Sequence, residues 1–260
     1  MAFVHLHLHT IYSFLDGLVK PGELAKKLKK LGMTAVAITD HGNMHGVVDF
    51  YTTMIGKDAK SGGYNLLENA EIKPVIGMEA YISAHDRTEK VKSDAFHMLL
   101  LAENETGYKN LCYMASTAFV DGFYYKPRID RALIKDHAEG IIATSACLGG
   151  EIPRALVAGK DDDAKRIALE YIELFGKNNF FIELQVNGIK EQEEVNPKLI
   201  KLARELGVGL VATNDVHYLS PEDAEAQDIL FCINEKKKVT DTDRMHHETA
   251  AFYLKSEEEM

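Results

Sequence analysis

Cysteine is scarce in this sequence, and long hydrophobic runs and targeting signals are missing. The three cysteines, Cys112, Cys147 and Cys232, are far apart among the 260 residues. Their spacing excludes a disulfide framework and a CxxC zinc knuckle, and it favours a reducing compartment. No apolar run approaches the roughly 20 residues of a membrane span, and no basic segment followed by an apolar one opens the chain. We therefore predict a cytoplasmic protein without a membrane-spanning segment.

Positive charge is also in short supply. The chain carries 30 lysines and arginines against 40 aspartates and glutamates, which gives a net charge of −10. This balance argues against a large duplex-binding surface, because phosphate contacts need clustered lysine and arginine. It leaves open the binding of a strand end, where a few metal ions can supply the positive charge.

The pattern of apolar residues predicts a folded α/β protein. Hydrophobic residues make up 46% of the chain and charged residues 27%, without low-complexity tracts, which argues against disorder. Strand-like apolar runs alternate with amphipathic helical patterns. The expected strands are Phe3–Leu8, Thr34–Thr39, Lys73–Ile82, His97–Ala102, Gly140–Thr144, Phe180–Leu184 and Gly209–Thr213. The expected helices cover residues 21–31, 44–56, 106–119, 161–175, 197–206 and 221–233.

Repeated β-α alternation with about seven strands predicts a (β/α) barrel in preference to an open sheet. The segment Lys57–Glu71 is rich in glycine, serine and asparagine and is expected to be a surface insertion. With no repeat or linker in view, residues 1–260 are predicted to form a single domain. The tail Leu254–Met260 begins like a helix and then stops, as expected for an N-terminal domain excised from a longer polypeptide.

Three histidines share one face of the opening strand. Alternation places His5, His7 and His9 on one side and apolar residues on the other. Three imidazoles on one face are hard to explain as core filling, because each needs a polar partner once it is buried. Metal ions are a natural shared partner for such a group.

Further potential ligands recur where expected strands give way to loops. They are His41, Glu79, Cys147, Asp215 and His217. In a (β/α) barrel the carboxyl ends of the strands converge on one face, so these side chains are expected to meet there. A further histidine, at position 97, begins its apolar run, so either that strand runs against the others or its boundary lies elsewhere. The mixture of imidazole, carboxylate and thiolate suits zinc, with manganese or iron as competitors.

The sequence around these residues resembles a known family. The chain is similar to the polymerase and histidinol phosphatase (PHP) superfamily, and specifically to the N-terminal PHP domains of bacterial DNA polymerase III alpha subunits. The resemblance covers essentially the whole chain. It is carried by His7-Leu8-His9-Thr10, Tyr12-Ser13-Phe14-Leu15-Asp16-Gly17, Thr39-Asp40-His41-Gly42-Asn43, Gly122-Phe123-Tyr124, Lys126-Pro127-Arg128-Ile129-Asp130, Ala212-Thr213-Asn214-Asp215 and Asp215-Val216-His217.

The resemblance implies a distorted seven-stranded (β/α) barrel that holds two or three divalent metal ions, most readily zinc. It places His7, His9 and Asp215 on a first metal, with Glu79 bridging to a second. It gives His97 and Cys147 to the second metal, and Asp16, His41 and His217 to a third. The candidate catalytic residues are Asp16, His41, Asp215 and His217.

The implied activity is metal-dependent hydrolysis of a phosphodiester at a DNA 3′ end, a proofreading 3′-5′ exonuclease within a DNA-directed DNA polymerase. Implied partners are the other polymerase domains and a proofreading or other replisome subunit. Lys126, Arg128 and Arg131 are candidates for steering the phosphate backbone. One alternative is a small-molecule phosphatase of the histidinol-phosphatase kind, and another is a non-catalytic, metal-stabilised scaffold.

Several polar residues have simpler explanations. Taken singly, each proposed ligand could be a hydrogen-bonded structural residue, and only the combined motifs favour metal binding. His5 is expected behind the ligand pair, and Asp40 is expected to orient a ligand. Arginines at positions 128 and 131 are more often salt-bridge residues than phosphate clamps. The remaining histidines, including His247, are expected in loops or on the surface.

Overall fold

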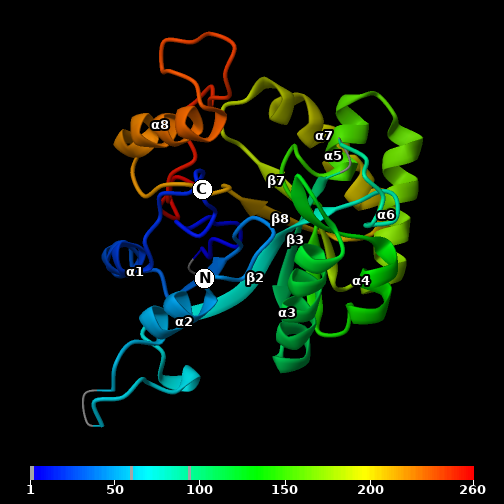
Figure 1. Ribbon diagram of the computed structural model, residues 1–260. Coiled ribbons are helices and arrows are strands. Elements are labelled where there is room, and N and C mark those ends of the chain that lie inside the picture. Colours follow the sequence, from blue (N-terminus) through cyan, green and yellow to red (C-terminus); the bar gives the residue numbers. More distant parts are fainter. Residues whose placement is uncertain (1–2, 59–60, 93–94) are drawn as a thin grey trace. The chain divides into compact units, whose positions relative to one another are not determined.

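The protein is described from a computed structural model (Figure 1) that covers residues 3–58, 61–92 and 95–260. The chain divides into two compact units. The first comprises Met1–Asp40, His45–Val75 and Asn214–Met260, and the second comprises His41–Met44 and Ile76–Thr213. Among the described residues, no helix combines the length and the apolar character that a bilayer crossing needs.

A curled mixed sheet organises the second unit (Figure 1). Its strands follow the order β4-β5-β2-β3-β6-β7-β8, and β1 pairs with β2 beside this path. Parallel pairs join β2 to β5, β6 to β7 and β7 to β8. The bounds are β1 Ala35–Ile38, β2 Lys73–Ile82, β3 Phe96–Ala102, β4 Phe123–Tyr124, β5 Lys126–Ile129, β6 Ile141–Thr144, β7 Phe180–Gln185 and β8 Gly209–Thr213. The predicted mixed α/β fold is confirmed, and the sheet is a curled half-barrel.

Strand β3 runs against its neighbours. It is antiparallel to β2 on one side and to β6 on the other. In the β2–β3 register Tyr81 lies opposite His97, so the first residues of β3 meet the last residues of β2. Of the two explanations that the sequence allowed for His97, reversal of the strand is therefore correct. A residue at the start of β3 lies at the same end of the sheet as residues at the end of β2.

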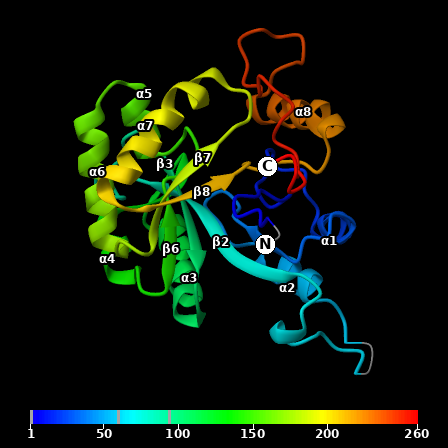
Figure 2. The same ribbon diagram turned by 180° about the vertical axis from the view of Figure 1, so that it is seen from behind.

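Five helices belong to the second unit, and polar side chains cap two of them. They are α3 (Glu105–Val120), α4 (Arg131–His137), α5 (Glu151–Val157), α6 (Asp161–Phe175) and α7 (Lys190–Leu206). The side chains of Asn104 and Asp130 cap α3 and α4 by accepting backbone N–H bonds from Gly107 and Leu133. Figure 2 shows α5 beside both α6 and α7. Apolar residues from these helices and from the sheet form one continuous core.

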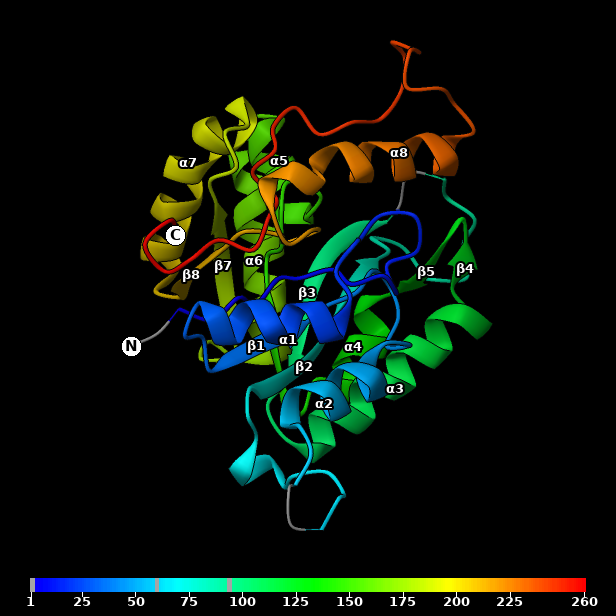
Figure 3. The same ribbon diagram turned by 90° about the vertical axis from the view of Figure 1, so that its left-hand side faces the viewer.

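The first unit holds the opening segment of the chain and the remaining helices (Figure 3). These are α1 (Pro21–Lys30), α2 (Val47–Ile55), α8 (Ala224–Glu235) and the short 3₁₀ turns η1 (Leu67–Asn69) and η2 (Pro221–Asp223). Helix α1 buries Leu24, Ala25 and Leu28, whose spacing places them on one face. Buried Pro21 stands at its first position, where the missing N–H costs nothing.

The opening segment is extended, but it forms no continuous ladder. Its backbone alternates between two neighbours, because Ala37 donates to the carbonyl of His5 and His9 donates to the carbonyl of Val216. The result is an isolated parallel bridge between Leu8 and Val216 where a strand was expected. The segment is nevertheless held on both sides, which fixes the direction of its alternate side chains.

Other boundaries also differ from those expected. Strands β4 and β5 and helices α4 and α5 were not expected, because each has at most seven residues and too short a periodic pattern. Helix α7 begins at Lys190 and continues through Pro197, whose ring lies on its exposed side. The expected insertion Lys57–Glu71 is largely irregular and exposed, and its residues 59–60 lie outside the described part.

Two helical glycines give a test of this packing. A Cβ at Gly107, in the first turn of α3, would lie 1.8 Å from the backbone oxygen of Gly140, whereas a Cβ at Gly22 in α1 meets nothing within 4 Å. We expect Gly107→Ala to lower the free energy of unfolding by about 1–3 kcal/mol through overpacking. Gly22→Ala should raise it by roughly 0.5 kcal/mol through helix propensity. Urea titrations followed by circular dichroism measure both, and equal midpoints for the two variants would contradict the packing.

Candidate metal centre

Two imidazoles and one carboxylate converge in the first unit. His7 and His9 are fully buried, and Asp215 is 7% exposed. Oδ1 of Asp215 lies 3.2 Å from Nε2 of His7 and 3.1 Å from Nε2 of His9, and the two imidazole nitrogens are 3.1 Å apart. Ligand atoms around a tetrahedral zinc ion are about 3.3 Å from one another, given bonds of about 2.0–2.1 Å. The three atoms therefore have the spacing of ligands to one ion.

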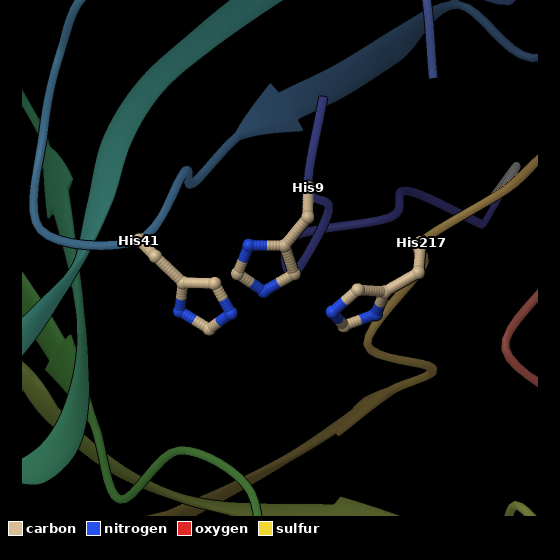
Figure 4. Close-up of side chains that lie close together, drawn as sticks. All are labelled: His9, His41 and His217. Carbon is tan, nitrogen blue, oxygen red and sulfur yellow. The ribbon is translucent and has the colours of Figure 1, made fainter. Parts of the chain in front are cut away.

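A fourth and a fifth candidate ligand adjoin these three. His217, which is 4% exposed, stacks on His9 with ring centroids 4.5 Å apart, as Figure 4 shows for the two side chains. Nδ1 of His217 lies 3.5 Å from Oδ1 of Asp215, and its Nε2 lies 3.4 Å from Oδ1 of Asp16. The first unit therefore gathers five of the predicted ligands, which we call the Asp215 cluster: His7, His9, Asp16, Asp215 and His217.

The loop after the opening segment is tied down by Asp40. Its buried carboxylate accepts hydrogen bonds from the backbone N–H and the hydroxyl of Thr10 and from the hydroxyl of Ser13. Oγ of Ser13 lies 3.1 Å from Nδ1 of His9, so the second nitrogen of that imidazole is also held. Asp40 thus anchors the loop next to His9, and its predicted role in orienting a metal ligand stays a prediction.

Electrostatics in the Asp215 cluster favour the ionised carboxylate. Burial by itself raises the pKa of the Asp215 carboxyl, because it penalises the charged form. The neighbouring imidazoles of His7, His217 and His9 outweigh this effect and hold the pKa well below its usual range. The carboxylate is therefore ready to bind a cation at neutral pH.

A second group surrounds Glu79 in the other unit. This residue is 1% exposed. Its Oε2 lies 2.6 Å from Nδ1 of His41, and its Oε1 lies 3.0 Å from Nδ1 of His97. Sγ of Cys147 is 3.7 Å from Oε1 of Glu79 and 3.6 Å from Nδ1 of His97. We call this set of two imidazoles, a carboxylate and a thiol the Glu79 cluster; Figure 4 labels its member His41.

Close backbone approaches hold the Glu79 cluster together. Gly42, next to His41, has φ +60°, and its N–H donates to the carbonyl of Glu79; a Cβ there would lie 2.8 Å from the Pro127 ring. The N–H of His97 donates to the carbonyl of Gly149. Gly149 in turn donates its N–H to Sγ of Cys147. Each ligand is thus placed by the backbone beside it.

The donor sets of both clusters fit a divalent metal ion. One atom each from His41, Glu79 and His97 lie within 4.8 Å of one another, a spacing that allows a shared ion. Imidazole with carboxylate, and with thiolate in the Glu79 cluster, suits zinc. His7, His9 and Asp215, which were predicted to bind one ion, lie together in one unit. Two other predictions involve residues of both units and stay predictions: the bridging role of Glu79, and the grouping of His41 with Asp16 and His217.

Two other histidines of the first unit are fully or partly buried. His5 is fully buried, and its Nε2 lies 2.8 Å from the carbonyl oxygen of Lys255; burial lowers its pKa to about 4. It fills space behind the ligand pair, as expected. His247 lies in an irregular segment, as expected, and its half-buried ring stacks on Phe252 at 4.0 Å and lies edge-on to His217 at 5.6 Å. No motif in the sequence marks this contact.

The three candidate phosphate-steering residues differ in position. Arg128 is 1% exposed and donates to the backbone carbonyls of Gly122, Arg87 and Glu89, which is a structural role and differs from the one expected. Arg131 is ion-paired with two carboxylates, those of Glu151 and Glu170. Lys126 is exposed, with its Nζ 5.1 Å from the centre of the Tyr81 ring.

Comparison with known proteins places the chain in a family. The model of the PHP domain matches residues 5–187. The DNA polymerase III subunit alpha of Borreliella burgdorferi is 47% identical over 99% of this chain, and that of Helicobacter pylori strain J99 is 45% identical over 100% of it. This chain spans 22% and 21% of the length of those relatives. The expected resemblance to DNA polymerase III alpha subunits is therefore confirmed.

A solved structure supports the same fold. A protein from Bifidobacterium adolescentis, described as a "putative metal-dependent phosphoesterase", superimposes with a TM-score of 0.50 at 16% identity. The match covers 82% of this chain and 87% of that one. At this identity the similarity concerns the fold alone. By the match to residues 5–187, this chain belongs to the PHP domain family.

Proposed function

We propose that the chain is a metal-dependent phosphodiesterase module of a bacterial replicative DNA polymerase and that it acts on a DNA 3′ end. The observation that carries the proposal is the pair of buried carboxylates, Asp215 and Glu79, each facing at least two imidazole nitrogens. Buried acids and histidines in such numbers need a cationic partner or a shared proton. Metal binding satisfies both clusters at once.

The ligands are proposed residue by residue. In the Asp215 cluster, His7, His9 and Asp215 hold one ion, and Asp16 and His217 hold another. In the Glu79 cluster, Glu79, His97 and Cys147 hold an ion, with His41 adjoining. Divalent ions at these positions supply the charge that stabilises a phosphoryl oxygen, and they lower the pKa of a coordinated water. Zinc is the proposed ion, with manganese or iron as alternatives.

The chain's own residues position these groups and exclude water from most of them. His7 and His9 are 0% exposed, so their ring nitrogens are shielded. Asp40 holds the loop that carries His9 and Asp16. Asp16, His41, Asp215 and His217 are the proposed catalytic residues. Lys126 is the proposed phosphate contact, because its ammonium group is exposed while Arg128 and Arg131 are committed to internal contacts.

The proposed substrate follows from the relatives. These are DNA polymerase III alpha subunits of which this chain spans about a fifth, so the remaining polymerase domains are proposed partners. A strand end suits a chain of net charge −10, since metal ions supply the positive potential that the surface lacks. A small-molecule phosphatase and a metal-stabilised scaffold are the alternatives that the experiments below separate.

Metal content is the first test. Asp215→Asn and Glu79→Gln each remove a central carboxylate charge from one cluster and should each lower the content by about one ion per chain. His137→Ala is a control, because His137 packs on Tyr113 outside both clusters. Mass spectrometry of the proteins purified at neutral pH without chelator gives the ratios. A metal-free wild-type protein would refute metal binding.

Hydrolysis is the second test. We expect metal-dependent shortening of a 5′-labelled primer from its 3′ end, abolished by chelator and slowed about 100-fold or more in Asp215→Asn, since even outer-residue changes cost up to about 100-fold. Histidinol phosphate is assayed in parallel. Faster turnover of that monoester would favour the small-molecule phosphatase. Metal-loaded protein that cleaves neither substrate would favour the scaffold.

Asp40 provides a third test, because it accepts hydrogen bonds from Thr10 and Ser13 and is not itself a proposed ligand. Asp40→Asn keeps the shape but loses the charge that accepts bonds from Thr10 and Ser13. We expect metal affinity to fall about 10–100-fold, as for other residues that orient ligands. Asp136→Asn, at an exposed position of helix α4, is the control and should leave affinity unchanged. Equal affinities in the two variants, measured by competition with a chromogenic chelator, would show that Asp40 does not orient the site.

A further inference from the structure

The hairpin of β4 and β5, labelled in Figure 3, lies at one end of the sheet path and carries exposed aromatic residues. The strands are antiparallel, and Tyr124 lies opposite Lys126 across the turn. Phe123 is 55% exposed, and Tyr125, at the tip, is 64% exposed. Neighbouring exposed rings are a feature of surfaces that contact a ligand or a partner.

Tyr125 also has an unfavourable backbone conformation. Its φ is +60°, in the left-handed region that glycine and asparagine adopt most readily. A turn of this kind would be more stable with either of those residues, so a tyrosine here lowers the stability of the fold. Such a cost is typical of positions where the side chain serves a function.

Two lysines lie over aromatic rings along this part of the second unit. Nζ of Lys92 lies 5.6 Å from the centre of the Tyr125 ring, and Nζ of Lys126 lies 5.1 Å from that of Tyr81. Tyr81 in turn stacks on His41 at 5.8 Å and lies edge-on to His97 at 5.2 Å. Alternating rings and ammonium groups therefore connect the hairpin to the Glu79 cluster.

Buried Arg128 fixes the segment that carries Lys92. Its guanidinium donates to the carbonyl of Gly122 at the start of the hairpin and to the carbonyls of Arg87 and Glu89. One side chain thus ties the hairpin to residues 87–89, just before Lys92. The backbone segments that carry Tyr125 and Lys92 are consequently held together, which reduces the entropy lost when a ligand binds.

We propose that the β4–β5 hairpin is a stacking platform for single-stranded nucleic acid, on which a base lies against Tyr125 while Lys92 and Lys126 contact the backbone. Interleaved aromatic and basic groups are the chemistry by which proteins hold single strands without reading their sequence. The inference rests on the proposed function, since it supplies the path by which a strand end reaches the Glu79 cluster. The lysines favour a nucleic acid over a protein partner, because interface cores are depleted in lysine.

The test measures binding of a fluorescein-labelled oligothymidylate to the metal-loaded chain by fluorescence anisotropy. Tyr125→Asn removes the ring and suits φ +60°, so it should fold at least as well as the wild type, which a thermal melt verifies. Tyr125→Phe keeps the ring. Tyr113→Asn is the control, because Tyr113 is another exposed tyrosine, on helix α3, that packs on His137.

We expect Tyr125→Asn to weaken oligonucleotide binding about tenfold, as loss of one stacked base does, and Tyr125→Phe to retain it. Lys92→Gln should weaken binding less and flatten its salt dependence. Unchanged binding in Tyr125→Asn overturns the proposal, and so does an equal loss in Tyr113→Asn. If the hairpin binds a protein partner instead, oligonucleotide binding will be unchanged in Tyr125→Asn.

A second measurement separates this inference from the proposed function. Hydrolysis of bis(4-nitrophenyl) phosphate, which carries no nucleobase, should stay within about twofold of wild type in Tyr125→Asn, because no base needs to stack. If the wild-type chain hydrolyses no diester but binds the oligonucleotide through Tyr125, the proposed function fails and the platform stands. If it hydrolyses the diester and Tyr125 is irrelevant to binding, the platform alone fails.

Discussion

The contact between a buried carboxylate and its ring of imidazoles is the constraint on which the rest of this molecule depends. Asp215 and Glu79 have almost no access to solvent, and each faces imidazole nitrogens at hydrogen-bonding distance. Removing one partner from a buried ionic pair costs roughly 3–5 kcal/mol, because the other charge is left without compensation. The residues around each carboxylate must therefore keep its imidazole partners in place, and the nearby glycines and hydroxyl groups contribute to this placement.

The two clusters meet this constraint in different ways. The Asp215 cluster combines alternate residues of an extended segment with a loop that Asp40 holds in place. The Glu79 cluster depends on strand direction, because the reversal of β3 brings His97 from the start of one strand to the side of a carboxylate near the end of another. Backbone geometry, more than side-chain length, decides which ligands meet. This is why close approaches at Gly42 and Gly149 occur next to ligands.

The sequence predicted which side chains lie close together better than it predicted the elements that carry them. Alternation in the opening segment placed His7 and His9 on one face, and the structure brings both to Asp215. The segment was nevertheless expected to be a strand. Alternation of side chains shows which way they point, but it does not show whether the backbone hydrogen bonds go to one neighbouring strand or to two separate segments. The short hairpin of β4 and β5 has too few residues to show a period at all. Arg128 was a candidate for steering the phosphate backbone, with a salt bridge as the alternative, and only the fold reveals the backbone carbonyls that it binds. Contacts such as His247 on His217 depend on distant packing that no local pattern encodes.

The division of the first unit into three separate stretches of sequence has a consequence for synthesis. Residues 76–213 of the second unit are continuous, so three of the four Glu79-cluster ligands lie within one uninterrupted stretch, and His41 precedes it. The Asp215 cluster needs partners more than 200 residues apart, and its two halves meet only after the polypeptide has been made past His217. Contacts of such separation form late, because the intervening chain must first be ordered. His7 and His9 therefore cannot face Asp215 until more than 200 further residues have been made.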